Sequence, residues 1–387
     1  MEKKIPCTYM RGGTSKGCFF LDSDLPGDPL EREKWLLKIF GSPDVRQIDG
    51  MGGATPTTSK AAVVSKSSRD DADVDYWFYQ VGVGSPMVDT AMNCGNISSA
   101  VGPYAVDHNL VEVKEPVTPV RIYNVNTGKI IVARVPVRNG RFNPEGDYHI
   151  DGVPGLASKI DLAFYHPQGA VTGKLLPTGN PVDFEEIDGE RVAYSFVDAA
   201  NPMVFVNSRP LGIKGTETPA SYEALEDIKN IKRKIERIRG VCAVAAGLAK
   251  DPEDARVNSP VLPKVVICSP PETYTGSSGN TIGEEEADIM ARLITLNGKM
   301  NPSFAGTAGI CVAVAANVPG TLVHKALCAR QGGERFETVR IAHPCGVMEV
   351  RAEFARDAKG RPAVESCILG RTARKIMDGF VYICLNS

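Results

Sequence analysis

Short apolar runs, many of them alternating with polar residues, dominate the chain and predict a protein built mostly from β-strands. Residues 73–83 (DVDYWFYQVGV), 119–127 (PVRIYNVNT) and 129–137 (KIIVARVPV) have the composition of strands, and Asn-Thr-Gly between the last two predicts a turn. Residues 337–354 (ETVRIAHPCGVMEVRAEF) predict two strands joined by a turn at 344–346. Strands therefore outnumber helices in the predicted fold.

Fewer segments carry the 3.6-residue period of a helix. Residues 28–40 begin with Asp-Pro and place four large apolar residues on one face, and residues 221–240 form an amphipathic helix that we expect to end at Gly240. Residues 283–296 predict a helix, because three glutamates in its first turn would suit the helix dipole. Residues 371–379 (RTARKIMDG) predict a last helix before a final strand.

Two stretches far apart in the chain share one plan. Residues 93–106 (NCGNISSAVGPYAV) and 304–320 (FAGTAGICVAVAANVPG) each predict a tight turn, a helix of small residues and a Gly-Pro or Pro-Gly stop. A helix with small residues on every face is typical of one buried all round. We therefore expect an α+β protein of two pseudo-symmetric domains, each with a sheet wrapped around a central helix. The predicted domains are residues 1–191 and 192–378, with 379–387 as a C-terminal strand that returns to the first domain.

Composition narrows the classes of partner. The 387 residues carry a formal net charge of -2, so no global positive field exists to hold nucleic acid or an anionic membrane. No apolar run reaches the roughly 20 residues that span a bilayer, and the N-terminal MEKKIPCTYM lacks the core of a signal peptide. We expect a cytoplasmic protein that acts on a small molecule.

Metal and cofactor motifs are missing from the sequence. The ten cysteines form no C-x-x-C pair and the five histidines have no ligand spacing, which predicts reduced, mostly buried thiols rather than a zinc site. Neither a P-loop nor a G-x-G-x-x-G turn at the start of a helix occurs. We expect no metal and no cofactor.

The turn before each small-residue helix is the first candidate site. Backbone N–H groups at a helix N-terminus have no partner within the helix, and together with the dipole they attract anions. Gly95 and Asn96 would supply such donors in the first half, and Thr307, Ala308 and Gly309 in the second. If the halves face each other, two carboxylates of one molecule could be held between them. Two ordinary capped helices are the alternative.

Lys60 is the second candidate. It stands between the flexible stretch 49–59 (DGMGGATPTTS) and the apolar run AAVV. A lysine is almost never buried unless it is paired or functional, so Lys60 is either the edge of a strand or a partly desolvated base. Cys94, just before a helix N-terminus, is an acid/base, a nucleophile or a small filler. A third glycine-rich turn, residues 10–17, carries the hydroxyls of Thr14 and Ser15.

Several of these motifs together resemble the family of 2-methylaconitate cis–trans isomerase and 3-methylitaconate isomerase, whose relatives include 4-oxalomesaconate tautomerase and aconitate isomerases. The resemblance runs from residue 5 to about residue 382. The motifs that carry it are TYMRGGTSKG (8–17), DVRQIDGMGGATPTTSK (44–60), NCGNISSAVGP (93–103), AGTAGICVAVAANVPGT (305–321) and RTARKIMDG (371–379).

The resemblance implies a diaminopimelate-epimerase-like fold with the active site between two similar domains. It also implies a cofactor-independent isomerase that shifts or isomerises the C=C bond of a small unsaturated di- or tricarboxylate. By motif position, Lys60 matches the catalytic lysine, Ser15 the serine beside it and Cys94 the active-site cysteine. Asn201 resembles the substrate-side Asn-Pro turn. We expect substrate contacts from Thr14, Asn93, Gly95, Asn96, Asn201, Thr307, Ala308 and Gly309.

Two departures from the fold's relatives bear on the chemistry. Epimerases of this fold use one cysteine from each half, but the turn FAGTAG has none, and Cys311 lies several residues into the helix. Cys345 stands where a serine or alanine is expected. A keto–enol tautomerase, an amino-acid epimerase and a non-catalytic tricarboxylate binder stay open as alternatives. The exact acid, cis–trans isomerisation against a double-bond shift, and assembly into a homo-oligomer stay open as well.

Overall fold

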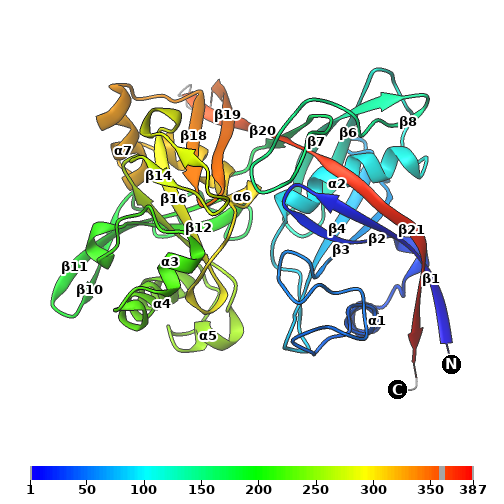
Figure 1. Cartoon of the computed structure of the whole chain (residues 1–387), viewed down its shortest axis with the longest axis horizontal. Coiled ribbons are helices and arrows are strands. Elements are labelled where there is room, and N and C mark those ends of the chain that lie inside the picture. Colours follow the sequence, from blue (N-terminus) through cyan, green and yellow to red (C-terminus); the bar gives the residue numbers. More distant parts are fainter. Residues whose placement is uncertain (1, 357–361, 386–387) are drawn as a thin grey trace. The chain divides into compact units, whose positions relative to one another are not determined.

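The computed structural model describes residues 2–356 and 362–385, and the chain divides into two units (Figure 1). Unit 1 is Met1–Tyr165 together with Gly370–Ser387, and unit 2 is His166–Leu369. The first boundary lies earlier in the chain than the expected one at 191/192, and the returning C-terminal segment begins before residue 379. Residues 386 and 387 of that predicted segment lie outside the described residues.

The sheet of unit 1 is one continuous series of hydrogen-bonded strands. Pairs β2–β3 and β4–β6 are parallel, and the other pairs are antiparallel. The C-terminal strand lies beside the N-terminal strand. In spatial order the strands are β21 (Ala373–Cys384), β1 (Glu2–Gly12), β2 (Ser15–Leu21), β3 (Lys60–Lys66), β4 (Val74–Val81), β6 (Val117–Asn124), β7 (Lys129–Arg138) and β9 (Ile160–Tyr165), with β5 (Val88–Asp89) on β4 and β8 (Arg141–Phe142) on β7.

Helix α2 (Gly95–Asp107) is the centre of unit 1. It contacts strands β1 to β4, β6 to β8 and β21, and every residue from Gly95 to Val106 is buried. Small residues are required there, since a Cβ on Gly102 would lie 2.6 Å from the Val135 side chain. The expected stop at Gly-Pro is wrong. Pro103 lies inside the helix, where close packing on all sides outweighs the loss of one N–H donor.

Helix α1 (Pro29–Phe40) packs on the opposite face of the unit 1 sheet. Its residues Leu36, Ile39 and Phe40 join an apolar cluster with side chains of β2, β3 and β4. The helix predicted over residues 28–40 is confirmed, with the side chain of Asp28 accepting a hydrogen bond from the N–H of Glu31. The sheet of unit 1 is thus covered by α2 on one face and by α1 on the other.

The strands of unit 2 also pair in a series. Pairs β12–β13 and β16–β18 are parallel, and the other pairs are antiparallel. In spatial order the strands are β10 (Asp183–Ile187), β11 (Glu190–Ala199), β12 (Asn201–Asn207), β13 (Lys264–Ser269), β16 (Ile289–Thr295), β18 (Thr338–His343), β19 (Gly346–Arg356) and β20 (Pro362–Arg371), with β17 (Lys299–Met300) on β16; β14 (Tyr274–Thr275) and β15 (Thr281–Ile282) pair separately.

The helices of unit 2 divide between the two faces of this sheet. Helix α6 (Gly306–Ala316) is buried at every residue and contacts β11, β12, β18 and β19. Helix α4 (Ile228–Ala245) packs its isoleucines on the other face, against β12 and β13. The remaining helices are α3 (Pro219–Glu223), α5 (Asp254–Asn258) and α7 (Leu322–Gln331), with 3-10 turns η1 (Asp22–Asp24) in unit 1 and η2 (Arg209–Leu211), η3 (Glu284–Glu286) and η4 (Leu296–Gly298) in unit 2.

The two units repeat one topology. From β1 to β7, successive strand pairs are antiparallel, parallel, antiparallel, parallel and antiparallel, and the pairs from β11 to β19 follow the same order. The central helix precedes the same strand in each unit, β6 in one and β18 in the other. The prediction of an α+β fold made twice around a central helix is therefore confirmed. Within residues 2–356 and 362–385, no helix is long and apolar enough to cross a membrane.

Two expected helices are strands. Residues 283–296 contain β16, which is buried on both faces, so its continuous apolar run has no alternation to mark it as a strand. Of residues 371–379, those from 373 onward form the first part of β21. Its buried and exposed positions do not alternate regularly, so the sequence resembles the period of a helix. The segment 221–240 is also not one helix: α3 ends at Glu223, and Gly240 lies inside α4, close against Pro252.

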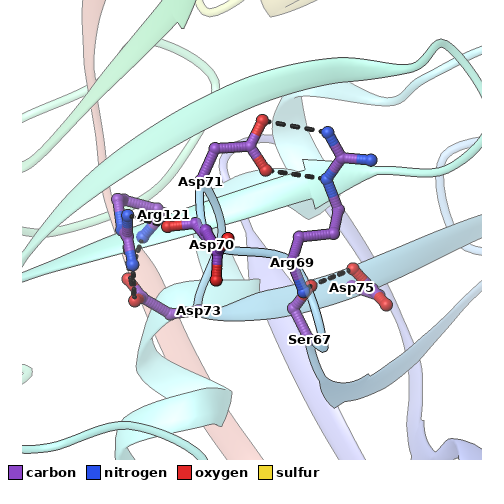
Figure 2. Close-up of polar contacts among 7 residues, drawn as sticks. All are labelled: Ser67, Arg69, Asp70, Asp71, Asp73, Asp75 and Arg121. Atoms are coloured by element: carbon purple, nitrogen blue, oxygen red, sulfur yellow. Dashed lines mark hydrogen bonds and ion pairs between the residues drawn. The ribbon is translucent and has the colours of Figure 1, made fainter.

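A surface network ties the β3–β4 hairpin of unit 1 to strand β6 (Figure 2). The Arg121 guanidinium on β6 donates to the Asp73 carboxylate at 2.7 Å and to the Asp70 carbonyl at 2.8 Å. Arg69 and Asp71 pair at 2.7 Å within the hairpin turn. Burial acts to raise the pKa of Asp73, but hydrogen bonds from Arg121 outweigh it and hold that pKa below its ordinary value. The carboxylates of Asp71 and Asp73 are thus each paired with an arginine.

Candidate functional site

The turn between β1 and β2 lies against the first turn of α2. Gly12 pairs with Ser15, and Gly13 adopts φ 51°, a left-handed conformation that favours glycine. A Cβ on Gly12 would lie 2.4 Å from the Asn96 carbonyl oxygen. The motif Arg-Gly-Gly-Thr-Ser therefore needs its glycines to bring Thr14 and Ser15 against the helix end, and Ser15 is buried there with 4% of its surface exposed.

Lys60 is the first residue of β3 and is 92% removed from solvent, with 8% of its surface exposed. Its Nζ donates to Gln80 Oε1 at 2.6 Å and lies 5.0 Å from the centre of the Phe78 ring. Gln80 is oriented by its own amide, which donates to the carbonyls of Pro56 and Ser59, both at 3.1 Å. Lys60 forms no ion pair with a carboxylate in the described part of the chain, so its partners are uncharged.

Ser15, Lys60 and Gln80 share the face of the sheet that packs on α2. Lys60 lies level with Gly17 on β2 and with Gln80 on β4. Side chains two residues apart on a strand point to the same face, so Ser15 points the same way as Gly17 and Lys60. Among the described residues no hydrogen bond joins Lys60 to Ser15 or to Cys94. The sequence-predicted residues are thus gathered at one end of the sheet without being locked to one another.

The N-terminus of α2 completes this end of unit 1. Cys94 is the residue before the helix, is half-buried and makes no capping hydrogen bond through its side chain. The Asn96 side chain donates to the Thr14 hydroxyl at 2.9 Å, which joins the helix to the β1–β2 turn. Asn93 accepts a hydrogen bond from the Ser98 hydroxyl at 3.1 Å. Thr14, Asn93, Cys94, Gly95 and Asn96 therefore form one contiguous group.

Two residues of this end were missed by sequence reasoning. Gln80 is the hydrogen-bond partner of Lys60. Tyr76 lies on the same face of β4 as Gln80 and is a neighbour of Cys94. Burial raises the pKa of Tyr76 well above its ordinary value, and the neighbouring Cys94 adds to the rise, so the phenol stays neutral. Both are assigned only once the β3–β4 register is known, and the sequence carries no signal for that register.

Unit 2 repeats the contact between hairpin and helix. Asn201, at the start of β12, donates through its side-chain amide to the Thr307 hydroxyl at 3.1 Å, just as Asn96 contacts Thr14 in unit 1. Ala200, the residue between β11 and β12, has φ 61° and corresponds to Gly13. Asn201 and Thr307 are thus brought together as a pair of turn and helix residues.

Both central helices begin with buried, uncapped N–H groups. The residues before them, Cys94 and Ala305, make no side-chain cap, whereas α1 and α7 are capped by Asp28 and Thr321. Helix α4 also lacks a side-chain cap, but its first turn is partly exposed to water. Buried N–H donors need an acceptor. These two helix ends are therefore suited to a carboxylate.

The N–H of Gly309 is already taken. It donates to the Ala305 carbonyl at 3.0 Å as the first hydrogen bond of α6. Only the N–H groups of Gly306, Thr307 and Ala308 precede it in the helix. Gly309 instead brings α6 close to β19, since a Cβ there would lie 2.6 Å from Met348 Sδ. The donors of this helix end are thus those of the three residues before Gly309.

The cysteines of unit 2 differ from that of unit 1. Ala305 occupies before α6 the place that Cys94 occupies before α2. Cys311 is fully buried, donates to the Val197 carbonyl at 3.4 Å, and burial raises the pKa of its thiol. Cys311 therefore lies in the core of unit 2. Cys345 is half-buried and donates to the Pro302 carbonyl at 2.8 Å. Unit 2 therefore has no thiol at its helix N-terminus.

A known family model, described as PrpF protein, matches residues 2–384. The chain belongs to the PrpF protein family. Among PrpF-like relatives, the 3-methylitaconate isomerase of Eubacterium barkeri is 44% identical, covering 99% of this chain and 98% of the relative. The 2-methyl-aconitate isomerase of Shewanella oneidensis is 38% identical, with 98% and 97% covered. The 4-oxalomesaconate tautomerase of Pseudomonas putida is 37% identical, with 99% and 97% covered.

Solved structures agree with this assignment to the PrpF family. A methylitaconate delta-isomerase is 44% identical and matches with a TM-score of 0.80, covering 99% of this chain and 96% of the other. A hydroxyproline epimerase from Agrobacterium vitis, at 13% identity and a TM-score of 0.54 over 99% and 93%, shares the fold alone. The predicted family, its epimerase-like fold and the prediction that the chain is an isomerase are therefore confirmed.

Proposed function

We propose that this PrpF-family chain moves the C=C bond of a small unsaturated di- or tricarboxylate, with Lys60 as the base. The observation that carries the proposal is the surroundings of Lys60. Its amine is mostly buried and hydrogen-bonded to the neutral amide of Gln80, and no carboxylate of the described residues pairs with it. An ordinary structural lysine at such a depth would have an acidic partner. A lysine held by neutral groups can give up its proton and act as a base.

The reaction needs one proton moved and one charge stabilised. Lys60 removes a proton from the carbon next to the double bond, and the electron pair spreads through the C=C bond into the carboxylate that is conjugated with it. The amine then returns the proton to the other end of the allylic system, so that atoms and charge balance. N–H donors aimed at the carboxylate oxygens stabilise the added charge, and loss of one such donor typically costs about 3 kcal/mol.

Each neighbouring residue receives a proposed role. Ser15 orients the lysine or a substrate carboxylate, and Cys94 acts as an acid/base or shapes the pocket. The uncapped N–H groups of Gly95 and Asn96 bind a carboxylate, with Thr14 and Asn93 holding this end of the helix in place. In unit 2 the same task falls to the first turn of α6, at Thr307 and Ala308, where Asn201 holds the Thr307 hydroxyl.

Among candidate acids we favour 3-methylitaconate. The relative with that name is 44% identical, against 38% for the methylaconitate isomerase and 37% for the tautomerase. These acids differ by a methyl, a carboxylate or a keto group, and a methyl is worth only about 1–3 kcal/mol of discrimination. Identity therefore supports the choice, and turnover must decide it. We also propose that the enzyme works in the cytoplasm on this free acid, without nucleic acid or membrane.

An amino-acid epimerase of the same fold is less well supported. Such an enzyme needs an acid and a base on opposite sides of one carbon, and the fold supplies them as two cysteines. Here Ala305 stands in the place that matches Cys94, and Cys311 is buried with its thiol bonded to a carbonyl. One lysine and one thiol, without a second thiol at the helix N-terminus of unit 2, suit a reaction in which one base serves both allylic positions.

Proton NMR in D₂O tests the proposal directly. Wild-type protein is incubated with 3-methylitaconate, 2-methylaconitate, trans-aconitate and 4-oxalomesaconate, beside Lys60→Ala and the control Lys66→Ala. Lys66 ends the same strand and is exposed. We expect a new alkene signal with wild type and Lys66→Ala, and a rate at least 100-fold lower with Lys60→Ala, as befits loss of a general base.

Each other outcome overturns a part of the proposal. Turnover that survives Lys60→Ala removes the lysine mechanism and leaves the family intact. Turnover of 4-oxalomesaconate alone moves the chain to tautomerisation. No turnover of any acid by folded wild-type protein favours a tricarboxylate-binding role.

A further inference from the structure

A cavity of about 570 Å³ lies in unit 1, apart from the candidate catalytic residues. Its walls come from β1, the C-terminal end of α2, the loop after β8 and the first residues of β21. Lys60, Ser15 and Cys94 are not among its lining residues.

The acidic side chains of this cavity are already neutralised. Asp107, on the last turn of α2, pairs with Lys375 at 3.1 Å. Glu145 pairs with Arg138 at 2.7 Å. Two further lining residues, Arg11 and Arg374, form no ion pair with a carboxylate anywhere in residues 2–356 and 362–385. The lining side chains therefore carry three positive charges (Arg11, Arg374 and Lys375) against two negative ones (Asp107 and Glu145), a net charge of +1.

Arg11 is the better anchored of the two arginines. Among the described residues only one of its nitrogens, Nη1, makes hydrogen bonds: it donates to the Gly13 carbonyl at 2.9 Å and to the carbonyl and hydroxyl of Thr372, both at 3.0 Å. A guanidinium has five N–H donors, so those on Nε and Nη2 are open. Arg374 lies directly opposite Arg11 in the pairing of β1 with β21. Burial lowers the pKa of Arg11, and the charge of Arg374 adds to this effect.

Part of the cavity wall is apolar. Phe142 and Ile150 line it with 8% and 7% of their surfaces exposed, and Leu156 is 63% exposed beside them. Two guanidiniums that have no carboxylate partner among the described residues line the same cavity as these apolar side chains. This combination matches a molecule with one anionic end and one apolar end. Carboxylate fits the planar N–H pairs of arginine.

We propose that this cavity is a second binding site, in which Arg11 and Arg374 hold the carboxylate of an organic acid whose hydrocarbon part packs on Phe142 and Ile150. The ligand class is an aliphatic carboxylic acid of several carbons. The site is separate from the proposed site of isomerisation, because Lys60, Ser15 and Cys94 do not line the cavity.

Calorimetric titration with hexanoate tests the site. Two further probes are acetate, which lacks the long hydrocarbon chain, and hexan-1-ol, which lacks the carboxylate. We expect saturable binding of hexanoate, weaker binding of acetate by roughly fourfold for each missing methylene, and no binding of hexan-1-ol. Arg374→Gln should weaken hexanoate binding by about tenfold. Arg134→Gln, a control at an exposed arginine on β7 outside the cavity, should leave it unchanged.

The Lys60→Ala variant separates this proposal from the proposed function. Hexanoate binding should persist in that variant, whether or not isomerisation is lost. Loss of binding with Lys60→Ala would place hexanoate at the candidate catalytic residues and overturn the second site. Absence of saturable binding at roughly 10 mM, equal binding of hexan-1-ol, or unchanged binding in Arg374→Gln would overturn it as well.

Discussion

At the scale of single residues, the neutral surroundings of Lys60 matter more than its burial. A carboxylate in the place of the Gln80 amide would hold Lys60 in its ammonium form by attraction. An ammonium group has no lone pair, so Lys60 could not take a proton from the substrate. The Gln80 amide accepts the same hydrogen bond without that effect, and its own donors to Pro56 and Ser59 keep its oxygen toward the amine. Gln80 is thus a positioning residue for the proposed base.

Gln80→Glu should therefore lower kcat by roughly tenfold, because the new carboxylate attracts the Lys60 ammonium and holds it in the form that cannot take up a proton. The measurement is kcat with the acid that wild type converts. Gln80→Met, which removes the hydrogen bond but adds no charge, should lower the rate less. Equal rates in the three proteins would argue against Lys60 as the base.

At the scale of elements, the site depends on how closely the β1–β2 turn approaches α2. Gly12 packs so tightly on Asn96 that one added methyl group meets the helix backbone at 2.4 Å. Backbone cannot move aside as a flexible side chain can, so either the turn or the helix must shift. The same approach brings Thr14 within 2.9 Å of the Asn96 amide, which links the proposed carboxylate-binding helix end to the hairpin.

Gly12→Ala should lower the free energy of unfolding by about 1–3 kcal/mol, as is usual for overpacking. Urea denaturation followed by circular dichroism measures it. Gly27→Ala is the matched control, because nothing lies within 4 Å of the position of its new Cβ. Equal stability of the two variants would show that the β1–β2 turn tolerates displacement from α2.

Some helices and strands could be predicted from the sequence alone, and others could not. The small-residue helices, α1 and most strands were predictable, because each has a composition or period of its own. Strand β16 was not, since a strand buried on both faces has no alternation, and its Arg292 is fully buried where a polar residue suggests an exposed position. Lys60 and Cys94 were found from motifs, but Gln80 and Tyr76 depend on the pairing of β3 with β4, which only the fold defines.

At the scale of the whole molecule, the two ends of the chain hold unit 1 together. Strand β21 pairs with β1 along almost its entire length, from Glu2 opposite Cys384 to Gly12 opposite Ala373. The Arg-Gly-Gly-Thr-Ser turn follows directly on β1, so the proposed site is built on a strand that the last residues of the chain must cover. Unit 2 is inserted between these two strands in the sequence and has a core of its own.

This topology predicts that a destabilising substitution in the C-terminal strand β21 lowers the stability of unit 1 and leaves that of unit 2 unchanged. Ile383 is buried with 4% exposed, in one apolar cluster with Ile5 and Phe40, while the adjacent Tyr382 is 55% exposed. Ile383→Asp should destabilise unit 1 by about 3 kcal/mol, since it buries an unpaired carboxylate, whereas Tyr382→Asp should change little. Hydrogen exchange with mass spectrometry should show β1 and β2 losing protection while β12 and β13 keep theirs. Equal loss in both units would mean that they unfold as one cooperative body, and the C-terminal strand would then stabilise the whole chain.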